Sequence, residues 1–108
     1  MPGVIPGLLK QPLRLERFEP QPDGRGGWIE GWGLRVETLG RLQPLRGRTL
    51  ELDGRLHAEV SHALYLPPGT EARIGDRVVL EARCFRVAVT GLGHPGRYEK
   101  LLLREIPP

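Results

Sequence analysis

The chain has 108 residues, of which 39% are hydrophobic and 27% charged, and its 16 Lys+Arg against 13 Asp+Glu give a formal net charge of +3. That length supports one domain with a modest core, and the small positive charge permits contact with nucleic acid without requiring it.

Cys84 is the single cysteine, which excludes an internal disulfide. The N-terminus lacks the pattern of a signal peptide or a membrane span, so we expect a reducing compartment and no membrane partner. The absence of Asn and the scarcity of Gln and Met, beside abundant Pro and Arg, are typical of thermophilic proteins and equally of high-GC genomes.

The first residues predict an arm followed by two strand regions. Residues 1–12 are rich in proline and glycine, which favours a flexible N-terminal arm before one domain at 13–108; the apolar residues among them would also let the arm lie on a neighbouring subunit. Leu13–Phe18 alternates apolar and charged residues and predicts a short strand, and residues 19–27 predict a loop. Residues 28–44 predict one bent strand or two pieces, in which Gly31 and Gly33 weaken the strand or mark a bulge.

The stretch Leu56–Leu66 is the strongest strand signal, and the rest of the domain is expected to form around it. Its even positions are mostly apolar and its odd positions mostly polar, as in a long strand with one buried face. Proline at 67 and 68 ends it. His62 falls in the apolar row, which predicts a core histidine with one hydrogen-bond partner.

Residues 45–55 leave two alternatives open. Asp53-Gly54 favours a type I′ turn, which would make a hairpin leading into the long strand. Alternatively, Thr49 caps a short helix that Gly54 ends.

The C-terminal third predicts three more strands. Residues 77–82 and 83–90 form a tight hairpin around 81–83, with Phe85, Val87 and Val89 on one face; 91–97 is a glycine-rich loop, and 98–106 is a last strand. No stretch has sustained helical periodicity. We therefore predict an all-β, small single-domain β-barrel or sandwich of six or seven short antiparallel strands, with one short helix or hairpin near 48–55.

No residues form a catalytic or metal-binding constellation, so we expect neither an enzyme nor a bound cofactor. His57 and His62 would point to opposite faces of a single strand, and Ser61 has no nucleophile-elbow pattern around it. The loop sequence GLGHPG lacks the Lys-Ser/Thr and the helix of a phosphate-binding loop. Three aromatic residues, Trp28, Trp32 and Tyr65, would suit stacking on bases, or packing in a core or interface.

The order of short motifs resembles the bacteriophage head-tail joining family, also called head-closure, stopper or head-completion proteins. The matching stretches are Asp23-Gly24 with Gly26-Gly27-Trp28, Gln43-Pro44 with Gly47, Ala58-Glu59-Val60-Ser61-His62, Gly75-Asp76-Arg77-Val78, and 97–105. Together they span about residues 13–106. The chain departs from the family where Leu64–Pro67 replaces an Ile-Arg-Tyr-like run, and where Asp53-Gly54 stands in place of a helix.

The resemblance implies a small β-barrel that assembles as a ring, a hexamer or dodecamer, in the neck of a virion after assembly in the host cytoplasm. Its partners would be portal or adaptor proteins, a tail or tail-completion protein, further copies of itself and the genomic double-stranded DNA in the channel. Arg41, Arg46, Arg48 and Arg55 cluster around the ambiguous segment, and we expect them to face the channel or an adjacent ring, or else to form an ordinary solvated turn. The alternative function is a small single-stranded nucleic-acid-binding β-barrel.

Overall fold

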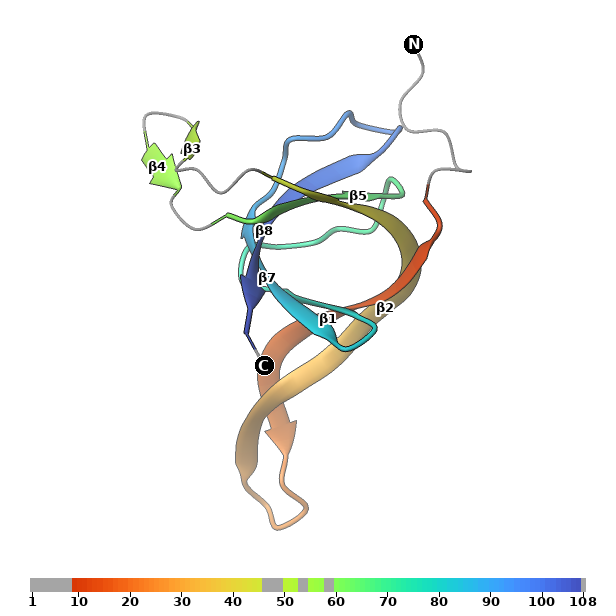
Figure 1. The fold of residues 1–108 in the computed structure, drawn as a ribbon. Coiled ribbons are helices and arrows are strands. Elements are labelled where there is room, and N and C mark those ends of the chain that lie inside the picture. Colours follow the sequence, from red (N-terminus) through yellow and green to blue (C-terminus); the bar gives the residue numbers. More distant parts are fainter. Residues whose placement is uncertain (1–8, 46–49, 53–54, 58–59, 108) are drawn as a thin grey trace.

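The protein is a closed barrel of six antiparallel strands (Figure 1). The structure is a computed structural model that describes residues 9–45, 50–52, 55–57 and 60–107. The barrel strands are β1 (Gln11–Pro22), β2 (Trp28–Pro44), β5 (His62–Leu66), β6 (Arg77–Leu80), β7 (Arg83–Val89) and β8 (Glu99–Ile106), in the order β1-β2-β5-β8-β7-β6. The predicted all-β class is confirmed, and the barrel alternative is the correct one. No helix long and apolar enough to cross a bilayer is found in the described residues.

A separate two-stranded sheet lies beside the barrel, formed by β3 (Leu50–Leu52) and β4 (Arg55–His57) (Figure 1). Of the two alternatives for this segment, the hairpin is therefore confirmed and the helix is wrong. The single long strand predicted at 56–66 is also wrong, because Val60 and Ser61 belong to no strand. The pairing of β2 with β5 ends where Pro44 meets His62, so no β2 partner remains for the residues before His62.

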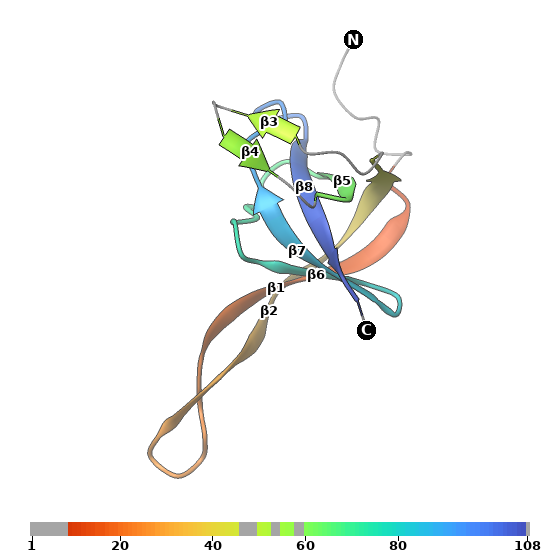
Figure 2. The same cartoon turned by 60° about the vertical axis from the view of Figure 1, so that its left-hand side comes forward.

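The strands β1 and β2 extend beyond the barrel as a projecting two-stranded ribbon (Figures 1 and 2). Strand β1 pairs with β6 only at Arg14–Glu16, and β2 pairs with β5 only at Arg41–Pro44. Residues 17–22 and 28–34 therefore pair only with each other, and we call them, with the turn 23–27, the ribbon. The loop predicted at 19–27 is wrong over 19–22, because a strand without an outer neighbour tolerates proline.

Strand β2 is one bent strand, as the first of the two alternatives predicted. The pairing with β1 shifts register after Leu15, so that Arg35 is skipped between Val36 and Leu34. This bulge lies just beyond the predicted glycine positions. At the other end, β1 begins at Gln11, inside the range predicted as a flexible arm; residues 1–8 lie outside the described part of the chain.

The barrel is filled by one cluster of buried apolar side chains. Its members are Leu13, Leu15, Leu64, Leu66, Val78, Leu80, Phe85, Val87, Leu101 and Leu103. A second, smaller cluster contains Val60, Ala63 and Leu102. Val89 packs on the second cluster rather than beside Phe85 and Val87, because the β7–β8 register shifts between Val87 and Val89. The prediction that these three residues share one face is therefore wrong for Val89.

The two predicted C-terminal turns are confirmed. Glu81 and Ala82 connect β6 to β7, and Glu81 has a φ of 54°, in the left-handed region that a two-residue hairpin turn requires. The loop 91–97 is closed by a bridge between His94 and Tyr98. Gly93 must be glycine there, because a Cβ atom would collide with the backbone of Tyr98 and Glu99.

Candidate interaction surface

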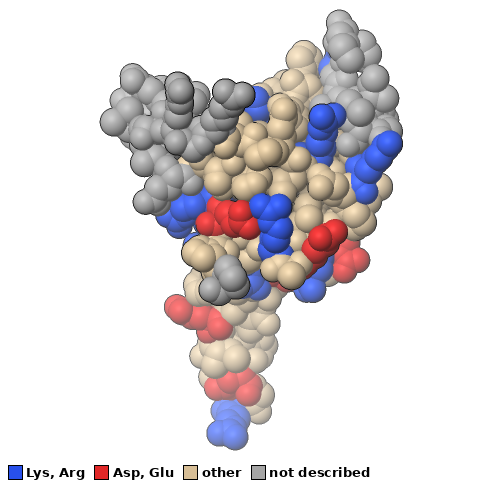
Figure 3. All heavy atoms as spheres, viewed as in Figure 1, with Lys and Arg blue, Asp and Glu red and all other residues tan. Residues whose placement is uncertain are grey.

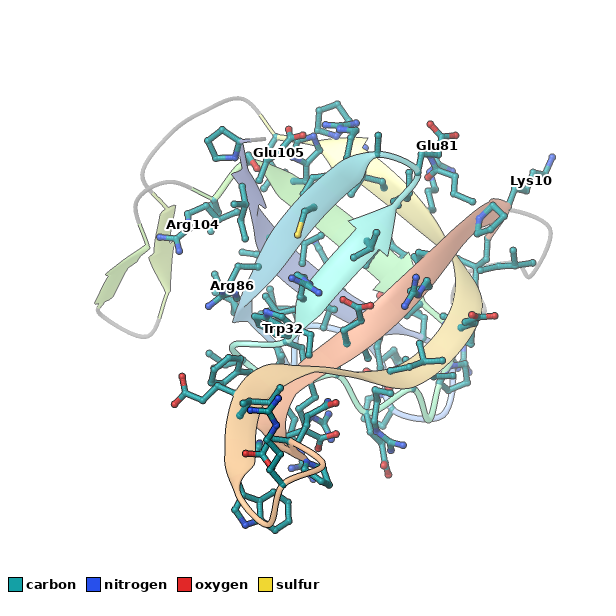
Figure 4. All side chains as sticks on the ribbon, turned by 90° about the horizontal axis from the view of Figure 1, so that it is seen from below. Lys10, Trp32, Glu81, Arg86, Arg104 and Glu105 are labelled. Carbon is teal, nitrogen blue, oxygen red and sulfur yellow. The ribbon has the colours of Figure 1, made fainter. Side chains whose placement is uncertain are left out.

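Where the ribbon joins the barrel, aromatic and arginine side chains lie against one another. Phe18 on β1 and Trp32 on β2 are opposite each other, and their rings meet edge to face with centroids 5.2 Å apart. The guanidinium carbons of Arg77 and Arg86 lie 4.4 and 4.9 Å from the centroid of the Trp32 ring. Figure 4, which views the molecule from below, shows Trp32 beside Arg86. Cation–π contacts of this kind hold the root of the ribbon against β6 and β7.

A buried carboxylate fixes the position of one of these arginines, Arg77. Glu16 is 5% exposed, and its Oε1 accepts a hydrogen bond of 2.7 Å from Arg77 Nε. Arg14 donates to Oε2 of the same group at 2.9 Å. Because Arg77 is held by Glu16 and also covers Trp32, the barrel wall and the ribbon root form one connected unit.

On the polar side of the ribbon root, a second buried carboxylate ties β1 to the loop before β6. Asp76 is 2% exposed and accepts hydrogen bonds from Arg17 Nε at 3.0 Å and Arg17 Nη2 at 3.1 Å. The backbone N–H of Arg73 also donates to Asp76, at 2.8 Å. The bond to the Asp76 carboxylate raises the pKa of Arg17, against the opposing effect of burial. The guanidinium therefore stays charged at every pH the protein meets.

The ribbon has one mainly apolar face and a second face that carries Arg17, Glu19 and Gln21 together with the exposed Ile29. Residues two apart on a strand share a face, and so do residues directly paired across strands. The register therefore places on one face Phe18, Pro20, Pro22, Trp28, Glu30, Trp32 and Leu34. Glu30 is the one charged residue of the ribbon on this apolar face. On the other face, the side chains of Glu19 and Gln21 lie over Gly31 and Gly33.

Much of the apolar face is open to solvent. Trp28 is 70% exposed, Leu34 54% and Phe18 50%. Aromatic side chains carry about 150–250 Å² each, so Trp28 and Phe18 alone leave on the order of 200–300 Å² of apolar surface uncovered. That approaches the largest apolar patch of a typical monomer, roughly 300–600 Å², and such patches mark interaction sites.

A shallow groove lies on the barrel beside the root of the ribbon. It is lined by Arg86, Arg104, Glu105, Ile106 and Pro107. Figure 4 shows three of these residues, Arg86, Arg104 and Glu105, on the same side of the barrel, with Lys10 and Glu81 on the opposite side. Arg86 Nε is a buried donor without a hydrogen-bond partner among the described residues.

At the Glu105 end of this groove, a network of hydrogen bonds connects Glu105 to His62. Arg83 donates to both carboxylate oxygens of Glu105 at 2.9 Å, and its Nη2 lies 3.2 Å from His62 Nε2. Arginine can only donate, so Nε2 is the acceptor, and we assign the histidine proton to Nδ1, which donates to Ser61 Oγ at 2.8 Å. Ser61 Oγ also accepts from the N–H of Glu105 at 2.9 Å. The predicted core histidine is confirmed, with two partners rather than one.

The same network shifts three pKa values. Burial, and then the positive charge of Arg83, lower the pKa of His62 below its usual range. The hydrogen bonds between Arg83 and Glu105 raise the pKa of the arginine and lower that of the carboxylate. At neutral pH the histidine is therefore neutral, and Arg83 and Glu105 form an ion pair.

The four arginines predicted as interface or channel residues are placed only in part. Arg41 is exposed on β2, opposite Tyr65. Arg55 begins β4, while Arg46 and Arg48 lie outside the described residues. Whether these arginines share a surface thus stays a prediction.

The three aromatic candidates for base stacking occupy separate places. Trp28 is at the outer end of the ribbon, Trp32 is covered by two arginines at its root, and Tyr65 packs against Tyr98 with centroids 6.0 Å apart. Tyr65 pairs with Arg41, nine residues along β2 from Trp32. At about 3.3 Å per residue this is roughly 30 Å of strand, so Tyr65 shares no stacking platform with the two tryptophans.

Nothing in the described residues gathers metal ligands: no group of three or more His, Cys, Asp or Glu side chains is placed to hold an ion. His57 and His62 were expected on opposite faces of a single strand. They lie instead in two different strands, at the end of β4 and the start of β5.

Arg77 and Arg86 were missed as functional candidates because in the sequence they are ordinary outward-facing strand residues. Only the barrel closure, which places β6 and β7 beside the ribbon root, brings them to Trp32. The exposure of Phe18 could have been predicted from the sequence. Leu13 and Leu15 lie two residues apart and share the buried face of β1, whereas Phe18 lies an odd number of residues further on and therefore faces outward.

Comparison with known proteins shows the fold but no family. No family model matches the chain, and no curated protein matches it. Solved structures that resemble it include a chain from the virion of a native gene transfer agent (GTA) particle, with a TM-score of 0.59 and 18% sequence identity. The match covers 91% of this chain and 96% of the other. The two chains therefore share one fold over nearly their whole lengths.

Proposed function

We propose that the protein is a structural virion component, a head-tail connector of the head-closure type from a tailed phage or phage-like particle. The observation that carries this proposal is the fold shared, nearly end to end, with a chain of a gene transfer agent virion. The order of head-closure motifs along residues 13–106 supports the finer assignment to the neck. In this role the chain would meet portal or adaptor proteins on one side and a tail protein on the other.

The proposed mechanism is steric rather than catalytic. Copies of the barrel form a ring below the portal, a hexamer or dodecamer, through which the genomic DNA passes. The ring narrows the channel, retains the packaged DNA and presents a surface for the tail. Arg41, Arg46, Arg48 and Arg55, around the β3–β4 hairpin, are the candidates to face the channel or an adjacent ring. A ring requires two different, complementary patches on every subunit.

The test is co-sedimentation of the purified protein with DNA-filled, tailless capsids, with DNA release followed by nuclease sensitivity. Retention on the capsids together with reduced DNA release is the expected result. Empty capsids without a portal serve as the control and should retain nothing. Absence of retention on portal-containing, filled capsids would refute the proposal.

A single-stranded oligonucleotide titrated in parallel tests the alternative function. Tyr65 is far from Trp28 and Trp32, and Trp32 is covered by two arginines, so the three aromatic residues share no stacking surface and we expect only weak, salt-sensitive binding. Tight binding of the oligonucleotide without capsid retention would reverse the ranking of the two functions.

A further inference from the structure

Ion pairs cancel much of the positive charge of the protein. Within the described residues, they join acidic side chains to Arg14, Arg17, Arg35, Arg77 and Arg83. Arg41 and Lys100 are different, because in the described part of the chain neither side chain takes part in a hydrogen bond or an ion pair. Both charges are therefore uncompensated within that part of the chain.

Arg41 and Lys100 lie in one row across three neighbouring strands. Arg41 on β2 pairs with Tyr65 on β5, and Tyr65 pairs with Lys100 on β8. Residues paired directly across strands share a face, so the three side chains lie together on the outside of the barrel. Lys100 Nζ is 5.5 Å from the centroid of the Tyr65 ring. We call Arg41, Tyr65 and Lys100 the basic row.

Lys10 adds a third cation at the β2 end of the basic row. The last pair of β1 and β2 at this end joins Gln11 to Gly40, so the exposed Lys10 lies next to Arg41. From Lys10 to Lys100 the surface crosses three strand spacings. At about 4.8 Å each, these make roughly 14 Å.

No acidic side chain of the described residues interrupts the basic row. The residues two positions away along the chain share its face and are uncharged: Leu39, Gln43, Ala63, Pro67, Tyr98 and Leu102. On the face seen in Figure 3, the described residues of the upper part of the barrel, where β5 lies in Figure 1, show basic side chains and no acidic ones.

The nearest carboxylates face other parts of the surface. Glu99 precedes Lys100 and therefore points to the opposite face of β8, where it accepts hydrogen bonds from the backbone N–H groups of Glu71 and Ala72 at 2.7 and 3.2 Å. Glu37 and Glu81 line a separate hollow beyond Leu39. The basic row thus presents cations and neutral donors to any partner.

This mixture of side chains fits the phosphate backbone of a nucleic acid. Proteins contact phosphate oxygens with lysine, arginine, glutamine and tyrosine side chains, and the surface presents all four types in Lys10, Arg41, Gln43, Tyr65 and Lys100. A DNA strand has one phosphate about every 3.4 Å along the axis, so three cations over roughly 14 Å face about four phosphates. The arginines around Trp32 suit this partner less well, because Glu16 and Glu105 lie among them.

We propose that the basic row, together with Lys10, binds the phosphate backbone of double-stranded DNA without reading its sequence. The choice of duplex DNA rests on the proposed connector function, in which the genome passes through the ring. The inference deepens that function by assigning the side of the barrel formed by β2, β5 and β8 to the wall of the channel. One copy offers few contacts and binds weakly, whereas the copies of a ring act together.

The salt dependence of duplex binding by the purified protein tests the basic row. Three phosphate contacts predict a slope of log K against log salt of about −2.7, measured by fluorescence anisotropy of a labelled short duplex from low salt upward. The double variant Arg41→Gln/Lys100→Gln should make this slope shallower by about 2 and weaken binding at low salt about tenfold.

A matched double variant controls for net charge. Arg25→Gln/Arg73→Gln removes the same charge from two exposed arginines elsewhere and should leave the slope unchanged. Equal losses of binding in the two double variants would overturn the inference, because only the net charge of the protein would then matter.

Photocross-linking on filled capsids tests the same surface in the assembled particle. Tyr65→benzoylphenylalanine should cross-link to the packaged DNA several-fold more than Ile74→benzoylphenylalanine. Ile74 is 69% exposed in the loop before β6, which is the strand opposite β5 in the barrel order. Cross-links mainly from position 74 would overturn the inference, because the other side of the barrel would then face the DNA.

The outcomes separate this inference from the proposed function. Capsid retention without a cross-link from position 65 to DNA overturns the inference and leaves the connector role in place. Duplex binding that depends on Arg41 and Lys100, without capsid retention, supports the phosphate-binding surface and overturns the connector role. Two further results would also overturn the inference. One is displacement of the duplex by an equal charge concentration of polyglutamate, which would indicate an acidic protein partner, and the other is tighter binding of the single-stranded oligonucleotide than of the duplex.

Discussion

Arg17 on β1 and Asp76 in the loop before β6 are joined by two parallel hydrogen bonds, and the carboxylate is 2% exposed. Removing the arginine leaves a buried negative charge with only backbone support. We therefore expect Arg17→Ala to lower the free energy of unfolding by about 2–3 kcal/mol, less than for a fully buried pair because Arg17 retains some solvent contact. Urea denaturation measures this change.

The exposed pair Arg35–Glu71 provides the control for that experiment. Its side chains are 39% and 70% exposed, so Arg35→Ala should change the free energy of unfolding by less than about 0.5 kcal/mol. Equal losses of unfolding free energy in Arg17→Ala and Arg35→Ala would contradict the explanation that Arg17→Ala is destabilising because Asp76 is buried.

Stability should fall as the pH drops from neutral, through His62. Its pKa is lowered in the folded protein, so below the ordinary pKa near 6.5 the unfolded chain binds a proton that the folded chain resists. The stabilisation is therefore complete above that value and is lost as the pH falls through the lowered pKa of the folded state. In His62→Gln, the difference in unfolding free energy between pH 7.5 and pH 5 should be smaller than in the wild type. If the two proteins lose the same unfolding free energy between pH 7.5 and pH 5, His62 is not the source of that loss.

The barrel interior should be far more sensitive to truncation than the ribbon. Phe85 is fully buried, with its ring 5.1 Å from that of His62, so Phe85→Ala should cost about 3–5 kcal/mol. Trp28→Ala, at a side chain 70% exposed, should change the stability of the monomer by less than about 0.5 kcal/mol. The same Trp28 variant should nevertheless weaken assembly on capsids. A large stability loss in Trp28→Ala would mean that the residue packs within its own subunit.

Gly93 should be intolerant of a side chain. A Cβ atom there would lie within 2.8 Å of backbone atoms of residues 98–100, which cannot move without opening the start of β8. We expect Gly93→Ala to lower the free energy of unfolding by about 2–3 kcal/mol. At Gly31 the nearest atom would be 3.6 Å away, so Gly31→Ala should be neutral or stabilising by up to ~1 kcal/mol. Thermal unfolding of the two variants provides the comparison, and equal effects would contradict this steric explanation.

The all-β fold was predictable from the sequence because turn residues and period-two alternation are local signals. The alternation over 62–66, for example, correctly placed His62, Leu64 and Leu66 on a buried face, although Ala63 in the opposite row is buried too. The ribbon was not predictable, because Pro20 and Pro22 normally end strands and only the absence of an outer neighbour makes them acceptable here. The groove was not predictable either, since Arg86 and Arg104 meet through the pairing of β7 with β8, which no local pattern encodes.

The prolines of the ribbon also make its two long edges unequal. Proline has no N–H to donate, so the β1 edge lacks donors at Pro20 and Pro22, whereas the β2 edge has no proline between Trp28 and Leu34. Two ribbons therefore cannot form a regular hydrogen-bonded sheet in which the β1 strand of one pairs with the β1 strand of the other. A strand added to the ribbon would therefore pair along its β2 edge rather than its β1 edge.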